Sequence, residues 1–243
     1  MYKKIVQELD KLKNPKHAKA LQRYFKTGKG EYGEGDIFLG LRMAQNRGVA
    51  KKYLKETKLT DVQKLLNSKI HEHRMVALLI LVEKYKKLSQ QIVRDSSPRL
   101  RSAQNDIFSF HLKNTENINN WDLVDLSAPN IVGQFLLDKD RKILYKLAKS
   151  DNLWERRIAV LACFAFIGQK DFRDAIKISK ILLKDKHDLI HKAVGWMLRE
   201  IGKQDEKVLI NFLNKYSCQM PRTMLRYSIE RLPEKKRKYY LKK

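Results

Sequence analysis

Apolar side chains recur at helical spacing along nearly the whole sequence, and this feature constrains the fold most. Ile5, Leu9 and Leu12, for example, share one face of a first predicted helix. Strict alternation of apolar and polar residues, which would indicate strands, is almost absent. Only five prolines and ten glycines interrupt the 243 residues, and 43% of the residues are hydrophobic, enough to build a core. The sequence therefore predicts an all-α fold.

Three segments of the sequence resemble one another, and they indicate repeats. Each has a polar helix start, then a basic residue and then an apolar run; the basic residues are Arg74, Arg157 and Lys192. The interval from Arg74 to Arg157 fits two repeats of about 40 residues, the period of paired-helix solenoids. We predict a single HEAT-like helical-repeat domain over residues 1–243, with these basic positions lining a concave face. The alternative is that any buried helix preceded by a basic turn shows this pattern.

The charge of the chain points to a polyanionic partner. Lys and Arg number 52 against 27 Asp and Glu, giving a net charge of +25. Nucleic acid is the first candidate, because phosphate contacts supply most of its binding energy. An anionic membrane surface is the second, and a basic protein without such a partner remains open. The basic C-terminal tail, residues 233–243, either follows phosphates or is simply solvated.

Nothing in the sequence indicates a membrane-spanning or exported protein. The longest apolar runs, Val76–Val82 and Ile158–Ile167, are far shorter than the ~20 residues that a spanning helix needs. The two cysteines, Cys163 and Cys218, do not require an oxidising compartment. We expect a cytoplasmic protein that acts as a monomer.

The most informative stretch for chemistry runs from Asn119 to Pro129. Trp121 and Asp125 are four residues apart, so they share a face of the predicted helix. A carboxylate beside an indole is unexpected on a phosphate-binding surface unless it has a task there. The alternative is that an acid in the first helical turn only complements the helix dipole. Asp122 competes for the catalytic role, but it points about 60° away from the side shared by Trp121 and Asp125.

Several stretches of the sequence resemble, in order and with similar separations, the AlkD-like DNA alkylation repair family. The clearest is Asn120–Asp125, with Pro129 and Gly133 behind it. The others are Asn14–Tyr24, Phe38–Leu41, Ser150–Trp154 with Arg157, and Lys192–Glu200. The resemblance covers most of the chain. It implies a HEAT-like helical solenoid that excises 3-methyladenine and 7-methylguanine from duplex DNA.

The resemblance also implies roles for individual residues. Asp125 matches the catalytic aspartate, and Trp121 and Trp196 match two tryptophans that pack on the sugar of the damaged nucleotide. Tyr24 matches an aromatic residue of the same cleft. Two arginines complete the match, one that grips a DNA phosphate and one in the cleft; they are Arg157 and Arg199. The basic positions Arg74 and Lys192 are added as expected DNA contacts from the repeat pattern.

The sequence departs from the family pattern at three places. Ala165 stands where the family can carry a basic residue, Ala44 stands where it usually has proline, and Gly28–Gly35 resembles an inserted flexible loop. The first departure weakens one expected phosphate contact. The other two do not touch the expected chemistry.

We therefore expect a DNA glycosylase of base excision repair that hydrolyses the N-glycosidic bond of cationic alkylated purines. One alternative is a non-catalytic helical-repeat protein that binds branched or distorted DNA, and another is an adaptor for an acidic protein. No cofactor or metal is expected. The histidine pairs His71 with His73 and His187 with His191 have metal-like spacing, but without a third ligand cluster they are more typical of surface histidines.

Overall fold

The computed structural model of the chain describes residues 1–95 and 97–242. These residues form an all-α helical-repeat fold, as the periodicity predicts, and they contain no β-strand; only an isolated bridge pairs Ile37 with Ile70. They divide into two compact units, unit 1 (Met1–Ser127) and unit 2 (Ala128–Lys243). The single-domain prediction for residues 1–243 stays a prediction.

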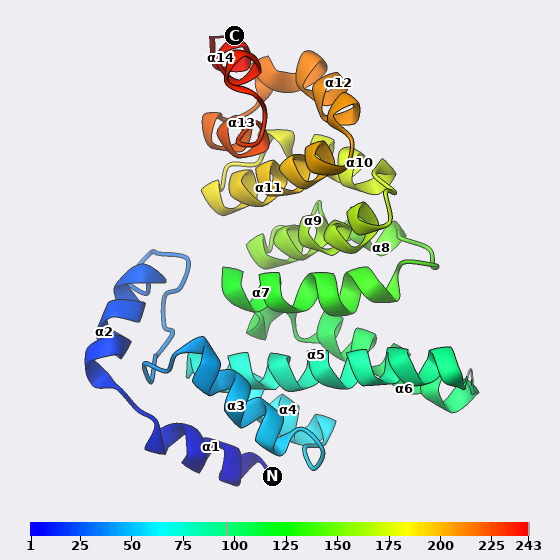
Figure 1. The fold of residues 1–243 in the computed structure, drawn as a ribbon. Helices are drawn as coiled ribbons and strands as arrows, with labels where there is room; N and C mark the ends of the chain where they lie inside the picture. The colour runs from blue at the N-terminus through cyan, green and yellow to red at the C-terminus, as the bar shows by residue number, and fades with distance from the viewer. Residues whose placement is uncertain (96, 243) are drawn as a thin grey trace. The chain divides into compact units, whose positions relative to one another are not determined.

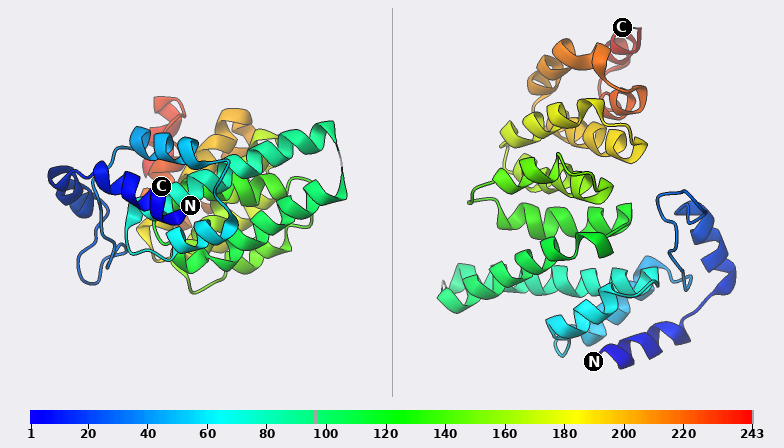
Figure 2. Two further views of the ribbon diagram at one scale, coloured as in Figure 1. Left: turned by 90° about the horizontal axis from the view of Figure 1, so that it is seen from below. Right: turned by 180° about the vertical axis from the view of Figure 1, so that it is seen from behind.

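Unit 1 is built around one long helix, α5. Its first half, from His71 to Val82, is buried, and α3, α4, α6 and α7 all pack against it (Figure 1). Helix α6 returns along α5 and is seen from below in Figure 2. The helices of unit 1 are α1 (Tyr2–Lys11), α2 (Pro15–Tyr24), α3 (Met43–Tyr53), α4 (Leu59–Leu66), α5 (His71–Arg94), α6 (Pro98–Lys113) and α7 (Trp121–Ser127), with a 3₁₀ turn at Thr115–Asn117.

The glycine-rich segment of unit 1 is anchored at its C-terminal end. The buried carboxylate of Glu72 accepts hydrogen bonds from the backbone amides of Leu39, Gly40 and Leu41, at 2.9, 2.8 and 3.2 Å. Gly40 has φ +91°, and a Cβ there would lie 2.2 Å from the carbonyl oxygen of Asn14, so only glycine fits. The loop that follows the predicted insertion Gly28–Gly35 is therefore fixed against the start of α5.

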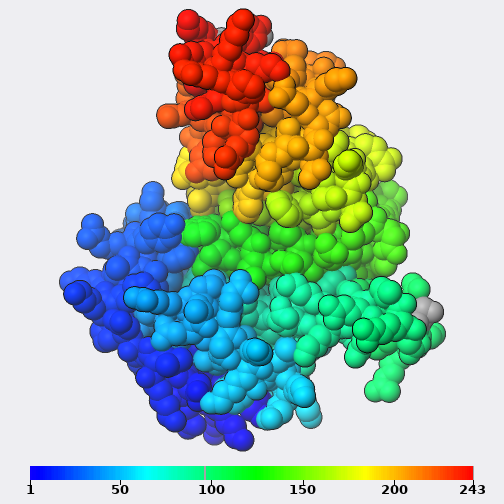
Figure 3. All heavy atoms as spheres, in the orientation of Figure 1, coloured from blue at the N-terminus to red at the C-terminus, as the bar shows by residue number. Residues whose placement is uncertain are grey.

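Unit 2 is a stack of helix pairs. Helices α9, α11 and α13 pack on one another in succession, while α8, α10 and α12 cover them from one side (Figure 1). The side chains of α12 and of α13 and α14 form a continuous surface at the end of the stack (Figure 3). The helices of unit 2 are α8 (Lys142–Leu147), α9 (Leu153–Gly168), α10 (Arg173–Ile181), α11 (Asp188–Gln204), α12 (Glu206–Tyr216), α13 (Arg222–Ser228) and α14 (Glu234–Lys242), with a π-helical turn at Ala128–Gly133 and 3₁₀ turns at Leu182–Lys184 and Ser217–Gln219.

Two close approaches hold this stack together. A Cβ at Gly195 of α11 would lie 2.6 Å from the carbonyl oxygen of Met224, and one at Gly133 would lie 2.4 Å from the carbonyl oxygen of Ala162. Helix backbones can approach this closely only where a side chain is missing.

The basic C-terminal segment forms α14 over its described residues. Tyr240 is 3% exposed, and its hydroxyl donates a hydrogen bond to Asn214 of α12 at 2.8 Å. None of the described helices is long and apolar enough to cross a membrane.

Candidate active site

A fully buried asparagine, Asn120, directly precedes helix α7. The Asn120 side chain accepts a hydrogen bond from the backbone amide of Trp121 at 2.8 Å, which satisfies a donor that the helix itself leaves unpaired. Its amide nitrogen donates to the Asp36 carboxylate at 3.3 Å. The start of α7 is thus fixed by a residue whose side chain is tied to the glycine-rich segment.

A chain of buried polar groups continues from Asp36 into α7. His71 Nδ1 lies 3.3 Å from Asp36 Oδ2, and His71 Nε2 lies 2.8 Å from Asp122 Oδ2. Arg74 Nη2 lies 2.7 Å from the same Asp36 oxygen. The side chains of Asp36 and His71 are 2% and 4% exposed, and that of Asp122 is 15% exposed. We call Asp36, His71 and Asp122 the α7 clamp.

The electrostatics of the clamp keep His71 charged. Burial alone disfavours the imidazolium, but the charge and hydrogen bond of Asp122, with the hydrogen bond of Asp36, outweigh it and raise the pKa of His71 to about 9. Burial also disfavours the charged form of Asp36 and so raises its pKa. The hydrogen bonds and charges of His71 and Arg74 outweigh this effect and leave the pKa of Asp36 below its usual value. At neutral pH the two carboxylates are therefore balanced by two cations.

Aromatic rings cover the clamp. Phe25 lies between Trp121 and Phe38, stacked on each at centroid distances of 5.0 and 5.1 Å. Phe38 in turn stacks on the His71 ring at 4.5 Å. Tyr24 meets Trp121 edge to face at 5.9 Å and is 65% exposed. The structure thus brings together two residues that the sequence singled out, Tyr24 and Trp121, at the edge of a packed aromatic cluster.

Asp125 lies one turn beyond this anchored start. It is partly exposed and lies on the same side of α7 as Trp121, which is also partly exposed. Leu123 and Val124, between them, are fully buried, as the sequence predicts. The Asp122 carboxylate is held by His71 in the interior.

The prediction that Arg74, Arg157 and Lys192 line an exposed face is wrong for the first two residues. Arg74 is 5% exposed and Arg157 is 4% exposed. Arg74 is held by Asp36 and by the carbonyl oxygen of Ser68, at 3.2 Å, so it belongs to the interior of unit 1. Arg157 donates to the carbonyl oxygen of Leu189. A basic residue in an early helical turn can pair inward as readily as it can face solvent.

The remaining predicted residues belong to unit 2. Trp196 is partly exposed, its ring lies 6.0 Å from that of Phe164, and its indole donates to Glu200 at 3.2 Å. Arg199 pairs with Glu230 and lies 3.5 Å from Glu200. Lys192 pairs with Asp188 at 2.7 Å and is 40% exposed. Their roles toward DNA stay predictions.

The histidines with metal-like spacing are used otherwise. His71 and His73 are 3% and 2% exposed, so the expectation of surface histidines is wrong for this pair. His187 caps α11 by accepting from the amide of Leu189, and His191 contacts the carbonyl oxygen of Asp185. Within residues 1–95 and 97–242, no group of three or more His, Cys, Asp or Glu side chains is placed to hold a metal ion.

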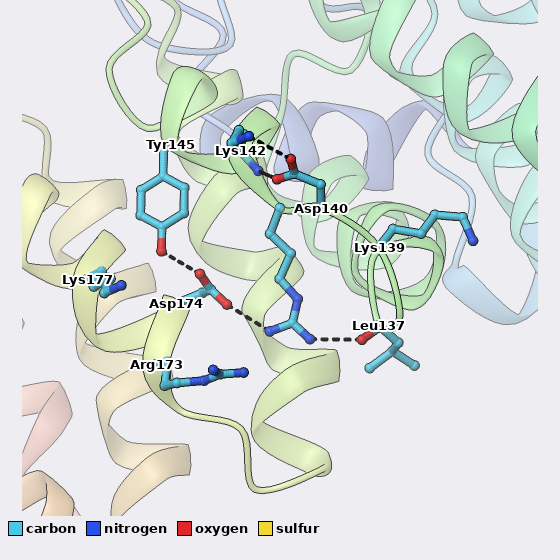
Figure 4. Close-up of a pocket in the computed structure, with 9 residues that line it drawn as sticks. Leu137, Lys139, Asp140, Lys142, Tyr145, Arg173, Asp174 and Lys177 are labelled. Atoms are coloured by element: carbon cyan, nitrogen blue, oxygen red, sulfur yellow. Dashed lines mark hydrogen bonds and ion pairs between the residues drawn. The ribbon is translucent and has the colours of Figure 1, made fainter.

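A basic cavity of 410 Å³ lies in unit 2, and none of the predicted site residues lines it (Figure 4). Arg141 anchors it but has its donors occupied: they reach Asp171, Asp174 and the carbonyl oxygens of Leu136 and Leu137. The other cations around it are exposed; Lys142, for instance, is 91% exposed. The cavity offers positive charge but no convergent set of reacting groups.

Sequence reasoning missed most of the groups that support α7. No sequence motif includes Asp36, and the sequence predicts a surface position for His71 despite its metal-like spacing to His73. The available signal was an acid directly before the apolar run Ile37–Leu39, at the end of a glycine-rich segment. An acid in that position needs a buried partner, and His71 and Arg74 are such partners.

Comparisons with known proteins identify the family and the fold. The family model described as "DNA alkylation repair enzyme" matches residues 5–232. Among solved structures, a predicted DNA alkylation repair enzyme from Enterococcus faecalis is similar, with a TM-score of 0.68 at 16% sequence identity, over 91% of this chain and 97% of that one. At that identity the likeness speaks for the fold. The comparison with curated proteins finds no match.

Proposed function

Because this chain belongs to the DNA alkylation repair enzyme family, we propose that it is a DNA glycosylase acting on cationic alkylated purines in duplex DNA. The observation that carries the proposal is α7 itself. It presents an indole and a carboxylate, Trp121 and Asp125, on one partly exposed side of a helix whose start is anchored in the interior.

One carboxylate is sufficient for this reaction. An alkylated purine such as 3-methyladenine or 7-methylguanine is positively charged in DNA, so it leaves as a neutral base and needs no general acid. As the N-glycosidic bond breaks, positive charge develops on the deoxyribose. Asp125 stabilises that charge and orients the water that adds to the sugar carbon, and the water's proton is released. The products are the free base and an abasic site.

The aromatic residues of unit 1 complement this carboxylate. The face of an indole is electron-rich and attracts a nearby cation. Trp121 stacks on Phe25 and makes a T-shaped contact with Tyr24, so its ring is presented in a fixed orientation. We assign Trp121 and Tyr24 to contacts with the sugar and backbone of the damaged nucleotide.

Binding to duplex DNA rests on charge. A net charge of +25 supplies the electrostatic attraction that phosphate contacts require. Lys192, Arg199 and Trp196 of unit 2 are proposed as DNA contacts. Arg74 and Arg157 are withdrawn because both are buried, Arg74 against Asp36 and Arg157 against the carbonyl oxygen of Leu189. The monomeric state and cytoplasmic location expected from the sequence stay predictions, as does a reaction without cofactor.

Base release tests the proposal. The full chain is incubated with duplex DNA treated with a methylating agent, and the released bases are separated by chromatography. We expect 3-methyladenine or 7-methylguanine to appear with time and in proportion to protein. If the protein binds duplexes or four-way junctions but releases no base above the spontaneous rate, it is a non-catalytic DNA-binding protein and the proposal is wrong.

A further inference from the structure

The α7 clamp is an unusual way to hold a short helix. The His71 ring lies 3.3 Å from the Asp36 carboxylate and 2.8 Å from the Asp122 carboxylate. These two partners are 35 and 51 residues away from His71 in the chain. Burying ionic groups costs desolvation energy, and apolar side chains of similar volume often stabilise a protein as well or better. Stability alone therefore does not account for the clamp.

What ionic hydrogen bonds add is direction. Burial of apolar surface is non-directional, whereas a charged hydrogen bond is lost if its partner turns away. The clamp acts on the two residues that flank Trp121 in sequence: Asn120 is tied to Asp36, and Asp122 is tied to His71. Trp121 is thus fixed from both sides, and Asp125 follows within the same helix.

We propose that the α7 clamp is a positioning device for base release, with Asp122 and His71 as positioning residues and Asp125 as the catalytic residue. This inference rests on the proposed glycosylase function. The clamp orients the side of α7 that faces the substrate and makes no contact with the reacting atoms. Asp122 points away from the side shared by Trp121 and Asp125, but it nevertheless affects the rate of base release.

The groups that face His71 make the clamp depend on protonation. Asp36 faces it from the glycine-rich segment, Asp122 from α7 and Arg74 from its own helix α5. His17 and Arg42 line the same 290 Å³ cavity beside it, as does Glu72, whose carboxylate is occupied by backbone amides. With His71 neutral, Asp36 keeps its ion pair with Arg74, whereas Asp122 loses its cationic partner and its contact to His71 weakens.

The decisive variant is Asp122→Asn. Asparagine keeps the size and can still accept from His71, but it removes the charge. On a duplex with one 7-methylguanine, with protein in excess, we expect the rate constant of base release to fall about 10- to 100-fold, the scale of a misplaced catalytic group. The Kd for undamaged duplex should be unchanged. Asp106→Asn is the matched control, since Asp106 is an exposed acid on α6, and it should leave both quantities unchanged.

Two further readouts separate positioning from a merely structural role. The rate constant of the unmodified protein should fall as the pH rises through about 9, and in Asp122→Asn this fall should occur at lower pH because a charge that holds the proton on His71 is gone. In ¹H–¹⁵N spectra without substrate, the Trp121 indole and Asp125 amide signals should move with the same midpoint as the His71 ring.

The outcomes are distinct from those of the proposed function. If folded Asp122→Asn keeps the unmodified rate and pH profile while Asp125→Asn loses activity, the clamp proposal is wrong and the glycosylase stands. If the unmodified protein releases no base, or if Asp122→Asn fails to fold, the spectra decide: signals of Trp121 and Asp125 that do not follow the titration of His71 overturn the clamp.

Discussion

The two units use the same helix-on-helix architecture but bury different kinds of group. Beneath α7 in unit 1 lies an ionic cluster in which the Asp36 and His71 side chains are 2% and 4% exposed. The ion pair of Arg141 and Asp171 in unit 2 lies nearer the surface, with side chains that are 14% and 22% exposed. The α11 to α13 contact of unit 2 instead depends on close backbone approach at Gly195.

This difference separates packing from positioning. A repeat stack needs apolar side chains and a few small residues, because neighbouring helices only have to cover each other. A helix that must hold particular side chains in fixed directions benefits from buried, directional contacts, even at a cost in desolvation. Unit 1 has such contacts under the helix that carries Trp121 and Asp125. The predictions below test whether the two units respond differently.

The largest effect is expected from Asp36→Ala. The substitution leaves Arg74 and His71 buried without their shared carboxylate, and removal of one partner of a buried pair costs about 3–5 kcal/mol. Hydrogen–deuterium exchange should speed up in α5 and α7, with peptides of α11 and α13 unaffected. The exposed control Asp106→Ala should change stability by less than about 0.5 kcal/mol. Unaltered protection of α7 would mean that the clamp does not hold it.

Alkaline pH should weaken unit 1 selectively. The folded pKa of His71 is about 9, above its ordinary 6.5, so its stabilising contribution is complete below pH 6.5 and is lost as the pH rises toward 9. The loss is on the order of 3 kcal/mol for a shift of this size. Exchange corrected for intrinsic pH dependence should show α7 opening in this range, and His71→Gln should abolish the trend.

On the acid side, burial depresses the pKa of His111 in α6 to about 4. Its neutral form is favoured in the folded state, so that contribution is lost as the pH falls from about 6.5 toward 4. Unit 1 should therefore be most stable near pH 6.5. A unit 1 whose protection is flat between pH 5 and 9 would contradict both assignments.

Gly195→Ala should damage unit 2 and leave unit 1 intact. The new Cβ would lie 2.5 Å from the Cβ of Tyr227 and 2.6 Å from a backbone oxygen, so α11 and α13 must move apart, at a cost of about 1–3 kcal/mol. Thermal melts and exchange of α11 and α13 measure this. Gly168→Ala is the control, because a Cβ there meets nothing within 4 Å. Equal melting temperatures for the two variants would show that the close approach is not needed.

The smallest effect on stability is expected at Lys192. Its ion pair with Asp188 is partly exposed, and such pairs contribute about 0.2–1 kcal/mol. If Lys192 contacts a phosphate, Lys192→Ala should reduce the slope of log K against log salt by ~0.9. An unchanged slope would remove this residue from the DNA-binding surface.

The sequence predicts the repeat fold and the shared helix face of Trp121 and Asp125 because both are local. Helical periodicity needs only neighbouring residues, and Trp121 and Asp125 are four positions apart on one helix. The apolar residues between them, Leu123 and Val124, are buried as expected. These inferences depend on contacts that lie within one or two turns.

The support of that helix could not be predicted in the same way. His71 meets Asp36 and Asp122 across 35 and 51 residues, and no pattern within a helix encodes those contacts. For the same reason Arg74 was expected on the surface. A basic residue after a polar helix start looks alike in sequence whether it faces solvent or a buried carboxylate from a distant loop.

The account depends most directly on the carboxylate of Asp125. The measurement is the single-turnover rate constant of base release from a duplex with one 7-methylguanine, for the unmodified protein, Asp125→Asn and Asp106→Asn. Asp125→Asn keeps the size of the side chain and deletes its charge, so we expect a loss of ~10²–10³ in rate with folding and duplex binding retained. Asp106→Asn should match the unmodified protein. If Asp125→Asn releases the base at the unmodified rate, the assignment of α7 as the catalytic helix is wrong.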